Sequence, residues 1–102
     1  METMETIERE DARKRVIVSY DVDGARRSLR SKVYRMVFGY KTTKGTGTTR
    51  KVYRYTGFAD QPGFQHLGQS VIALRPRDAE RLRSQLGELG IKNTGTPVLF
   101  LE

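Results

Sequence analysis

Two aspartates that lie close together, Asp21 and Asp23, could do chemistry in this chain of 102 residues. They follow a short β-branched run, and paired carboxylates supply the hard oxygen ligands that Mg²⁺ prefers. The Asp-Val-Asp-Gly sequence is equally typical of a turn, because Asp accepts local backbone hydrogen bonds and Gly24 permits a positive φ. We favour the turn. The alternative is a Mg²⁺ site on Asp21 and Asp23, with Asp21 as the catalytic residue.

A basic window between Gly24 and Ala59 is the main charge feature of the sequence. It contains ten Lys or Arg residues and no Asp or Glu, whereas the rest of the chain holds nine basic and twelve acidic residues. Like charges repel one another, and a polyanion such as nucleic acid relieves that repulsion. If half of the charges meet phosphates, we expect a log–log salt slope of about −4 to −5. The expected phosphate contacts are Arg26, Arg27, Arg30, Arg35, Lys41, Lys44, Arg50, Lys51 and Arg54.

Aromatic residues interleave with the cations of the basic window. Tyr53 and Tyr55 alternate with other residues of a predicted strand and share a face with Lys51, so we expect them to stack on unpaired bases. Tyr34 and Phe38 are four residues apart, a spacing that favours the packing of one helix onto its core.

The composition limits the class of protein. Apolar residues make up 36% of the chain and nine residues are aromatic, which favours one folded domain over disorder. Cysteine is absent, so disulfides, thiolate catalysis and cysteine-ligated zinc are excluded. We find no secretory signal and no run of roughly 20 apolar residues, and we expect a cytoplasmic protein. An Arg-rich composition without cysteine also suits a thermophile.

The expected elements alternate between strand and helix. Short β-branched and aromatic runs predict strands, and apolar stripes at helical spacing predict helices. Gly39 and Gly90 are placed to end the two helices. In chain order we expect a strand over 15–22, a helix over 25–38, strands over 51–56 and 69–74, a helix over 76–89 and a strand over 96–101.

The remaining segments are expected to be irregular. We predict a flexible acidic tail over 1–14, a mobile basic loop over 41–50 and a crossing loop over 57–68. The order βαββαβ predicts an α+β, ferredoxin-like sandwich over 15–102. In that fold a four-stranded antiparallel sheet carries two helices on one face, and the basic loop is an insertion.

Two strings of this sequence resemble the small CRISPR spacer-acquisition subunit of ferredoxin-like fold. They are Val16-Ile-Val-Ser-Tyr-Asp-Val22, followed by an Arg-rich helix, and Gly68-Gln-Ser-Val-Ile72, followed by a helix rich in Arg and Leu. The resemblance implies a homodimeric nucleic-acid binder. Because some members of that family are reported to be metal-dependent nucleases, it also implies a metal-ligand position at Asp21. The long basic segment over 38–67 departs from the family, which has a brief connection there.

The sequence thus leads to three hypotheses about function. The first is a small basic nucleic-acid-binding protein without catalysis or cofactor, for structured RNA in a ribonucleoprotein such as the ribosome, or for DNA. The second is a Mg²⁺-dependent endonuclease or a CRISPR-adaptation-like homodimer that uses Asp21. The third is an accessory subunit whose basic window binds an acidic protein.

Overall fold

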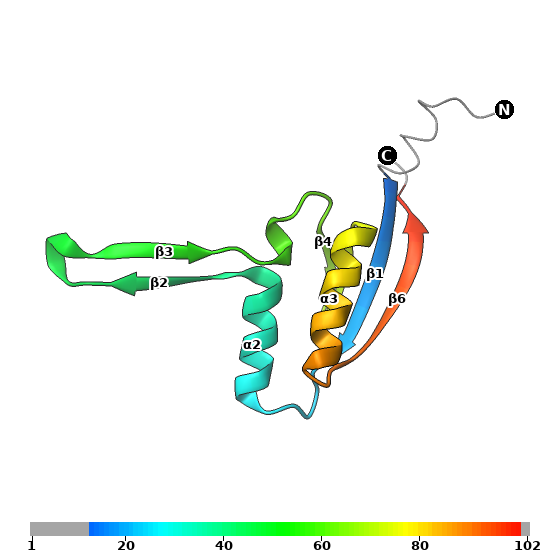
Figure 1. The fold of residues 1–102 in the computed structure, drawn as a ribbon, viewed down its shortest axis with the longest axis horizontal. Helices are drawn as coiled ribbons and strands as arrows, with labels where there is room; N and C mark the ends of the chain where they lie inside the picture. Colours follow the sequence, from blue (N-terminus) through cyan, green and yellow to red (C-terminus); the bar gives the residue numbers. More distant parts are fainter. Residues whose placement is uncertain (1–12, 101–102) are drawn as a thin grey trace. The chain divides into compact units, whose positions relative to one another are not determined.

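The computed structural model describes residues 13–100, which belong to two compact units (Figure 1). The sheet unit contains the described residues up to Val22 and from Pro62 onward, and the hairpin unit contains Asp23–Gln61. Neither helix within residues 13–100 is long and apolar enough to span a membrane.

The sheet unit is built on a four-stranded antiparallel sheet in the order β4-β5-β1-β6. Helix α3 packs against β1, β5 and β6. The strands are β1 (Lys14–Asp21), β4 (Gln65–Gly68), β5 (Val71–Leu74) and β6 (Lys92–Leu99), and the helix is α3 (Pro76–Glu88).

Alternation along the strands decides which side chains enter the core of the sheet unit. Val18 and Ile72 are cross-strand partners, and both are fully buried. Leu82 and Leu86, one helical turn apart on α3, are also fully buried. Each side chain of this size contributes about 1.5–3 kcal/mol when it is buried. As the sequence predicts, the helix begins at Pro76 and stops before Gly90, whose φ is 76°.

The hairpin unit contains one helix and a two-stranded sheet. Helix α2 (Arg27–Phe38) buries Val33 and Val37 and exposes its basic residues, in agreement with the predicted apolar stripe. Strands β2 (Tyr40–Lys44) and β3 (Lys51–Tyr55) form an antiparallel hairpin. Two single-turn 3₁₀ helices complete the unit, η1 (Gly47–Thr49) between the strands and η2 (Phe58–Asp60) after them.

A close backbone approach joins the end of α2 to the end of β3. Gly39 ends the helix, as predicted, with a φ of 76°, and its N–H donates to Arg35 O at 2.7 Å. A Cβ at Gly39 would lie 3.1 Å from Gly57 N, and a Cβ at Gly57 would lie 2.7 Å from Val37 O. Real Cβ atoms essentially never come within 3.0 Å of such atoms, and a Cβ at Gly39 would also be closer than that to Tyr55 O, so both positions need glycine.

The structure corrects the predicted sheet. The strand expected over 51–56 exists as β3, but it pairs with β2 in a separate two-stranded sheet instead of joining the four-stranded one. The chain is therefore an α+β protein with a four-stranded antiparallel sheet and two helices, and the expected single sheet is not formed.

Two segments that were predicted to be loops contain strands. Strand β2 begins at Tyr40, and its other residues lie in the predicted mobile loop over 41–50. A strand forms there because its threonines favour extended backbone and β3 satisfies its hydrogen bonds. Strand β4 lies in the predicted crossing loop over 57–68 and pairs with β5.

The first and last strands both begin earlier than predicted. Of the tail predicted over 1–14, residues 1–12 lie outside the described residues, and Lys14 is the first residue of β1. The last strand begins at Lys92, four residues earlier than predicted, because it pairs with β1 along its whole length.

The glycine contact can be tested by substitution. Gly57→Ala places a Cβ against backbone carbonyls and should lower the free energy of unfolding by about 1–3 kcal/mol. Gly87→Ala is the matched control. A Cβ there meets nothing within 4 Å, and alanine within α3 should raise the free energy by about 0.5–1 kcal/mol. Urea unfolding followed by tyrosine fluorescence measures both variants, because the chain has no tryptophan. Equal stability of the two variants would contradict a tight contact at Gly57.

Candidate nucleic-acid interface

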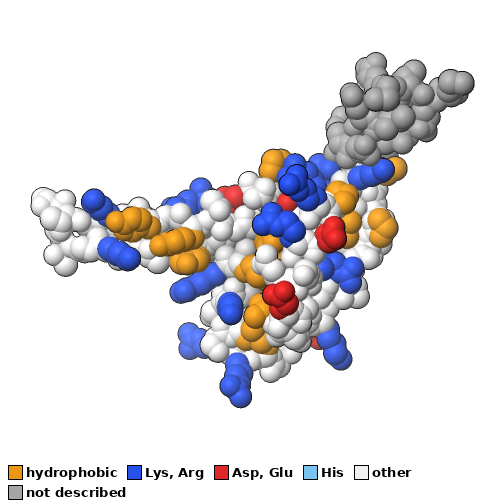
Figure 2. Space-filling view, viewed as in Figure 1, with side chains coloured by type: hydrophobic (Ala, Val, Ile, Leu, Met, Phe, Trp, Pro, Cys, Tyr) orange, Lys and Arg blue, Asp and Glu red, His pale blue; other side chains and the backbone are white. Residues whose placement is uncertain are grey.

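Every residue that was predicted to contact nucleic acid lies in the hairpin unit and is exposed. Arg26 precedes α2, and Arg27, Arg30 and Arg35 belong to it, whereas the remaining residues lie on the hairpin or in its connecting loop. Figure 2 shows basic and hydrophobic side chains following one another along the hairpin. The complete set is Arg26, Arg27, Arg30, Arg35, Lys41, Lys44, Arg50, Lys51, Tyr53, Arg54 and Tyr55.

The hairpin register assigns the side chains to two faces. Tyr40 pairs with Tyr55, Thr42 with Tyr53, and Lys44 with Lys51, and since partners share a face, these six residues form what we call the tyrosine face. The opposite face contains Lys41, Thr43, Val52 and Arg54. The predicted placement of Lys51, Tyr53 and Tyr55 on one face is therefore confirmed.

Three groups stack in a column at the base of the tyrosine face. The rings of Tyr40 and Tyr55 are stacked, with centroids 4.6 Å apart and planes inclined by 14°. The Cζ atom of Arg35 lies over the Tyr40 ring, 5.0 Å from its centroid. This column connects α2 to both strands, and a stacked aromatic pair contributes about 0.5–1.5 kcal/mol beyond the area it buries.

A second cation–aromatic contact lies nearer the hairpin tip. The Nζ atom of Lys44 is 5.6 Å from the centroid of Tyr53, on the neighbouring strand. The Thr42 Oγ1 atom on the same face is buried and has no hydrogen-bond partner among residues 13–100. The tyrosine face thus combines aromatic rings, cations and an unsatisfied hydroxyl.

Like charges face each other across the hairpin at two places. Lys44 is the cross-strand partner of Lys51 on the tyrosine face, and Lys41 is the partner of Arg54 on the opposite face. Sheets favour opposite charges at such positions, and directly opposed like charges are destabilising. The hairpin is therefore cationic on both faces.

One carboxylate offsets part of this charge. Asp60 accepts from Arg54 through Oδ1 at 2.6 Å and from the Gly57 N–H through Oδ2 at 2.9 Å. Within the described part of the chain, Arg54 is the one residue of the basic window that forms an ion pair with a carboxylate. Ten basic and two acidic residues give the hairpin unit a formal charge of +8.

Two aromatic residues lie elsewhere than the sequence indicates. Tyr34 was expected in a core but is 63% exposed, with its ring 4.8 Å from that of Phe38. Tyr40 is one of the aromatic residues that interleave with the cations, but it was not assigned to the site. The signal for it was a pair of short aromatic and β-branched runs around Gly45 and Gly47, which is typical of a hairpin.

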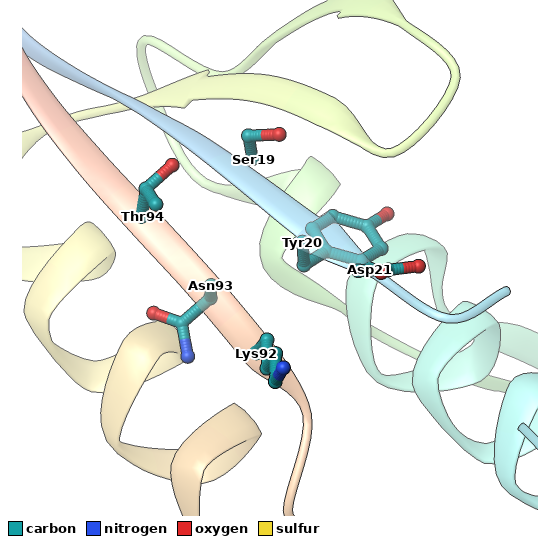
Figure 3. A pocket seen from close by; sticks show the side chains of 6 residues that line it. All are labelled: Ser19, Tyr20, Asp21, Lys92, Asn93 and Thr94. Atoms are coloured by element: carbon teal, nitrogen blue, oxygen red, sulfur yellow. The ribbon is translucent and has the colours of Figure 1, made fainter.

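Asp21 lies in the sheet unit, at the end of β1. It lines a shallow depression together with Ser19, Tyr20, Lys92, Asn93 and Thr94 (Figure 3). Tyr20 and its cross-strand partner Asn93 lie on the face of the sheet opposite to that of Asp21. Burial raises the pKa of the Tyr20 phenol. The partner of Asp21 is Lys92, an ammonium on the same face.

Within residues 13–100 the surroundings of Asp21 supply few ligands for Mg²⁺. Mg²⁺ takes several oxygen ligands, whereas Asp21 has a cation beside it in register. Within residues 13–100 no three His, Cys, Asp or Glu side chains form a group that could hold a metal. Asp23, the other residue of the alternative metal site, lies in a turn before α2, as the favoured interpretation predicts.

Comparison with protein-family models, with curated proteins and with solved structures gives no significant match. The assignment of function therefore depends on the residues themselves.

The opposed lysines make a prediction about stability. Lys44→Glu creates an opposite-charge pair with Lys51 and should raise the free energy of unfolding by about 0.2–1 kcal/mol. The gain should shrink at high salt, since both side chains are exposed. Lys92→Glu is the control, because it creates a like-charge pair with Asp21 and should lower the free energy by a similar amount. A loss of stability in Lys44→Glu at low salt would contradict the prediction, and it would show that the contact of Lys44 with the Tyr53 ring outweighs the repulsion between the two lysines.

Proposed function

We propose that this protein binds nucleic acid, RNA in preference to DNA, through the hairpin unit and without catalysis. The observation that carries the proposal is the pair of cationic cross-strand contacts, Lys44 with Lys51 and Lys41 with Arg54. Their repulsion reduces the stability of a hairpin that is exposed on both faces. Phosphates between or beside these cations would convert the repulsion into binding energy.

The charge distribution supports the same partner. The hairpin unit has a formal charge of +8, whereas the rest of the chain holds nine basic and ten acidic residues. A field concentrated in this way attracts a polyanion and accelerates association with it. An acidic protein would also neutralise the positive charge of the hairpin unit, but its binding would not account for the exposed tyrosines beside the cations.

The tyrosines favour RNA. Tyr40, Tyr53 and Tyr55 are 37–43% exposed beside the cations of the hairpin. Aromatic rings in such a setting stack on unpaired bases, which folded RNA displays in loops and bulges and which duplex DNA keeps inside its helix. We therefore propose that the protein is a subunit of a ribonucleoprotein in the cytoplasm.

The ferredoxin-like fold is proposed for the chain without its hairpin. When β2 and β3 are set aside, the elements follow the order βαββαβ. The sheet order β4-β5-β1-β6 then places the first and third of the four strands at the centre. We infer that the hairpin is an insertion into this pattern, between α2 and β4.

The binding surface can be tested by removing two charges. Arg50→Ala with Lys51→Ala should weaken the binding of RNA of any sequence and flatten the log–log salt slope by about 1 to 2. The control is Arg77→Ala with Lys92→Ala, which removes two exposed charges from the sheet unit and should leave the slope unchanged. Fluorescence anisotropy over a salt series measures both variants.

An unchanged affinity in Arg50→Ala with Lys51→Ala would reject this surface. Its lysines would then serve to keep the exposed strand edges from pairing with other chains, as edge lysines do in many sheets. Purification without nuclease gives an independent check. A nucleic-acid binder should carry an ultraviolet absorbance excess that nuclease treatment removes, and a binder of acidic proteins should not.

The absence of catalysis is tested separately. RNA and DNA incubated with the protein and Mg²⁺ or Mn²⁺ should remain at full length, because Asp21 has a lysine as its cross-strand partner. Denaturing gel electrophoresis with and without a chelator measures this. Metal-dependent cleavage that is lost in Asp21→Asn would replace the proposal with the endonuclease hypothesis.

A further inference from the structure

We infer that an unpaired RNA base stacks on the outer ring face of Tyr55 and extends the column formed by Arg35, Tyr40 and Tyr55. This inference rests on the proposed function and adds the kind of nucleic acid and the position at which a base is held. It concerns the tyrosine face alone, whereas the binding proposal depends on the charges of both faces.

The geometry of the column leaves one ring face open. Tyr55 covers one face of Tyr40, and we infer that the Arg35 guanidinium, 5.0 Å from the Tyr40 centroid, lies over the other face, because the stacked ring occupies the first. Tyr40 is therefore enclosed on both sides. Tyr55 ends the column, and among residues 13–100 Tyr40 is the one ring or cation in contact with it.

The other tyrosines of the unit are less suited to hold a base. Tyr53 already has the Lys44 ammonium beside its ring, and Tyr34 has the ring of Phe38 beside it on α2. Tyr55 is 43% exposed and is held in place by its stacked partner, so a base would meet a ring that is already oriented.

The cations of the tyrosine face lie where the backbone of such a strand would pass. Lys51 is four residues before Tyr55 on the same strand, a distance of about 13 Å at the usual rise per residue. Lys44 lies opposite Lys51. A single strand that stacks one base on Tyr55 can therefore place the phosphates of neighbouring nucleotides between the two lysines, which fits the charge of this end of the hairpin.

The test compares single-stranded and duplex RNA. The probes are oligo(U) of about 12 nucleotides, an oligo(A)·oligo(U) duplex of the same length, and oligo(dT). Tyr55→Val keeps a residue that favours strands but removes the ring, and it should lower the affinity for oligo(U) roughly tenfold while the affinity for the duplex stays unchanged.

Two further variants serve as controls. Tyr55→Phe keeps the stacking ring and should retain the wild-type affinity, and Tyr34→Val removes an exposed ring outside the column and should also retain it. The intrinsic tyrosine emission gives a second readout, since the chain lacks tryptophan. Oligo(U) should quench the emission of the wild type, and it should quench that of Tyr55→Val less.

The outcomes separate this inference from the binding proposal. If Tyr55→Val binds oligo(U) as well as the wild type while Arg50→Ala with Lys51→Ala still weakens binding, the stacking inference is wrong and the proposed function stands. If Tyr55→Val loses affinity for single strand and duplex equally, the ring supports the hairpin and does not hold a base. Binding confined to oligo(dT) would overturn the assignment to RNA, and a wild type that binds none of the probes would end both proposals.

Discussion

The hairpin unit depends on the backbone contact between Gly39 and Gly57. Because neither residue has a side chain, the end of α2 can lie against the end of β3, and the chain leaves the helix directly into β2. That departure fixes Tyr40 opposite Tyr55 and brings Arg35, from the last turn of the helix, over the Tyr40 ring. A shift of one residue in the pairing would move every side chain to the other face, so this contact at the base of the hairpin also determines which residues meet at its tip.

The fixed register gives the hairpin a stabilising aromatic contact at its base and a destabilising charge repulsion at its tip. Stacked rings and a cation over an aromatic ring stabilise the base of the hairpin, whereas opposed lysines destabilise its tip. Asp60 reduces the repulsion on the opposite face by its ion pair with Arg54, and the tyrosine face has no such carboxylate within residues 13–100. Sites that break a local rule of folding are commonly functional, and the tyrosine face breaks such a rule beside its exposed aromatic residues.

Much of this arrangement can be predicted from the sequence, because helical and strand periods are local. The stripes that bury Val33, Val37, Leu82 and Leu86, the glycines that end both helices, and the alternation of β3 all follow from residue spacing. Strand pairing does not, since it depends on contacts between distant residues. The sequence therefore indicated β3 but not its partner, and the polar β2 resembled a loop. The candidate site was incomplete for the same reason: Tyr40 acquires its role from Tyr55 across the hairpin.

The exposure of the hairpin has a thermodynamic consequence for any ligand. A two-stranded hairpin that is exposed to solvent on both faces is only marginally stable. Here η2 and the column hold the base of the hairpin, and nothing among the described residues buries its strands. A ligand that binds only the ordered hairpin stabilises it by mass action, by about 2.7 kcal/mol at a concentration a hundred times its Kd. That gain exceeds both the contribution of the stacked rings and the repulsion of one lysine pair. Under the proposed function, order at the tip would thus be coupled to occupancy by a polyanion, and the charges that weaken the free hairpin are the ones through which a bound strand would stabilise it.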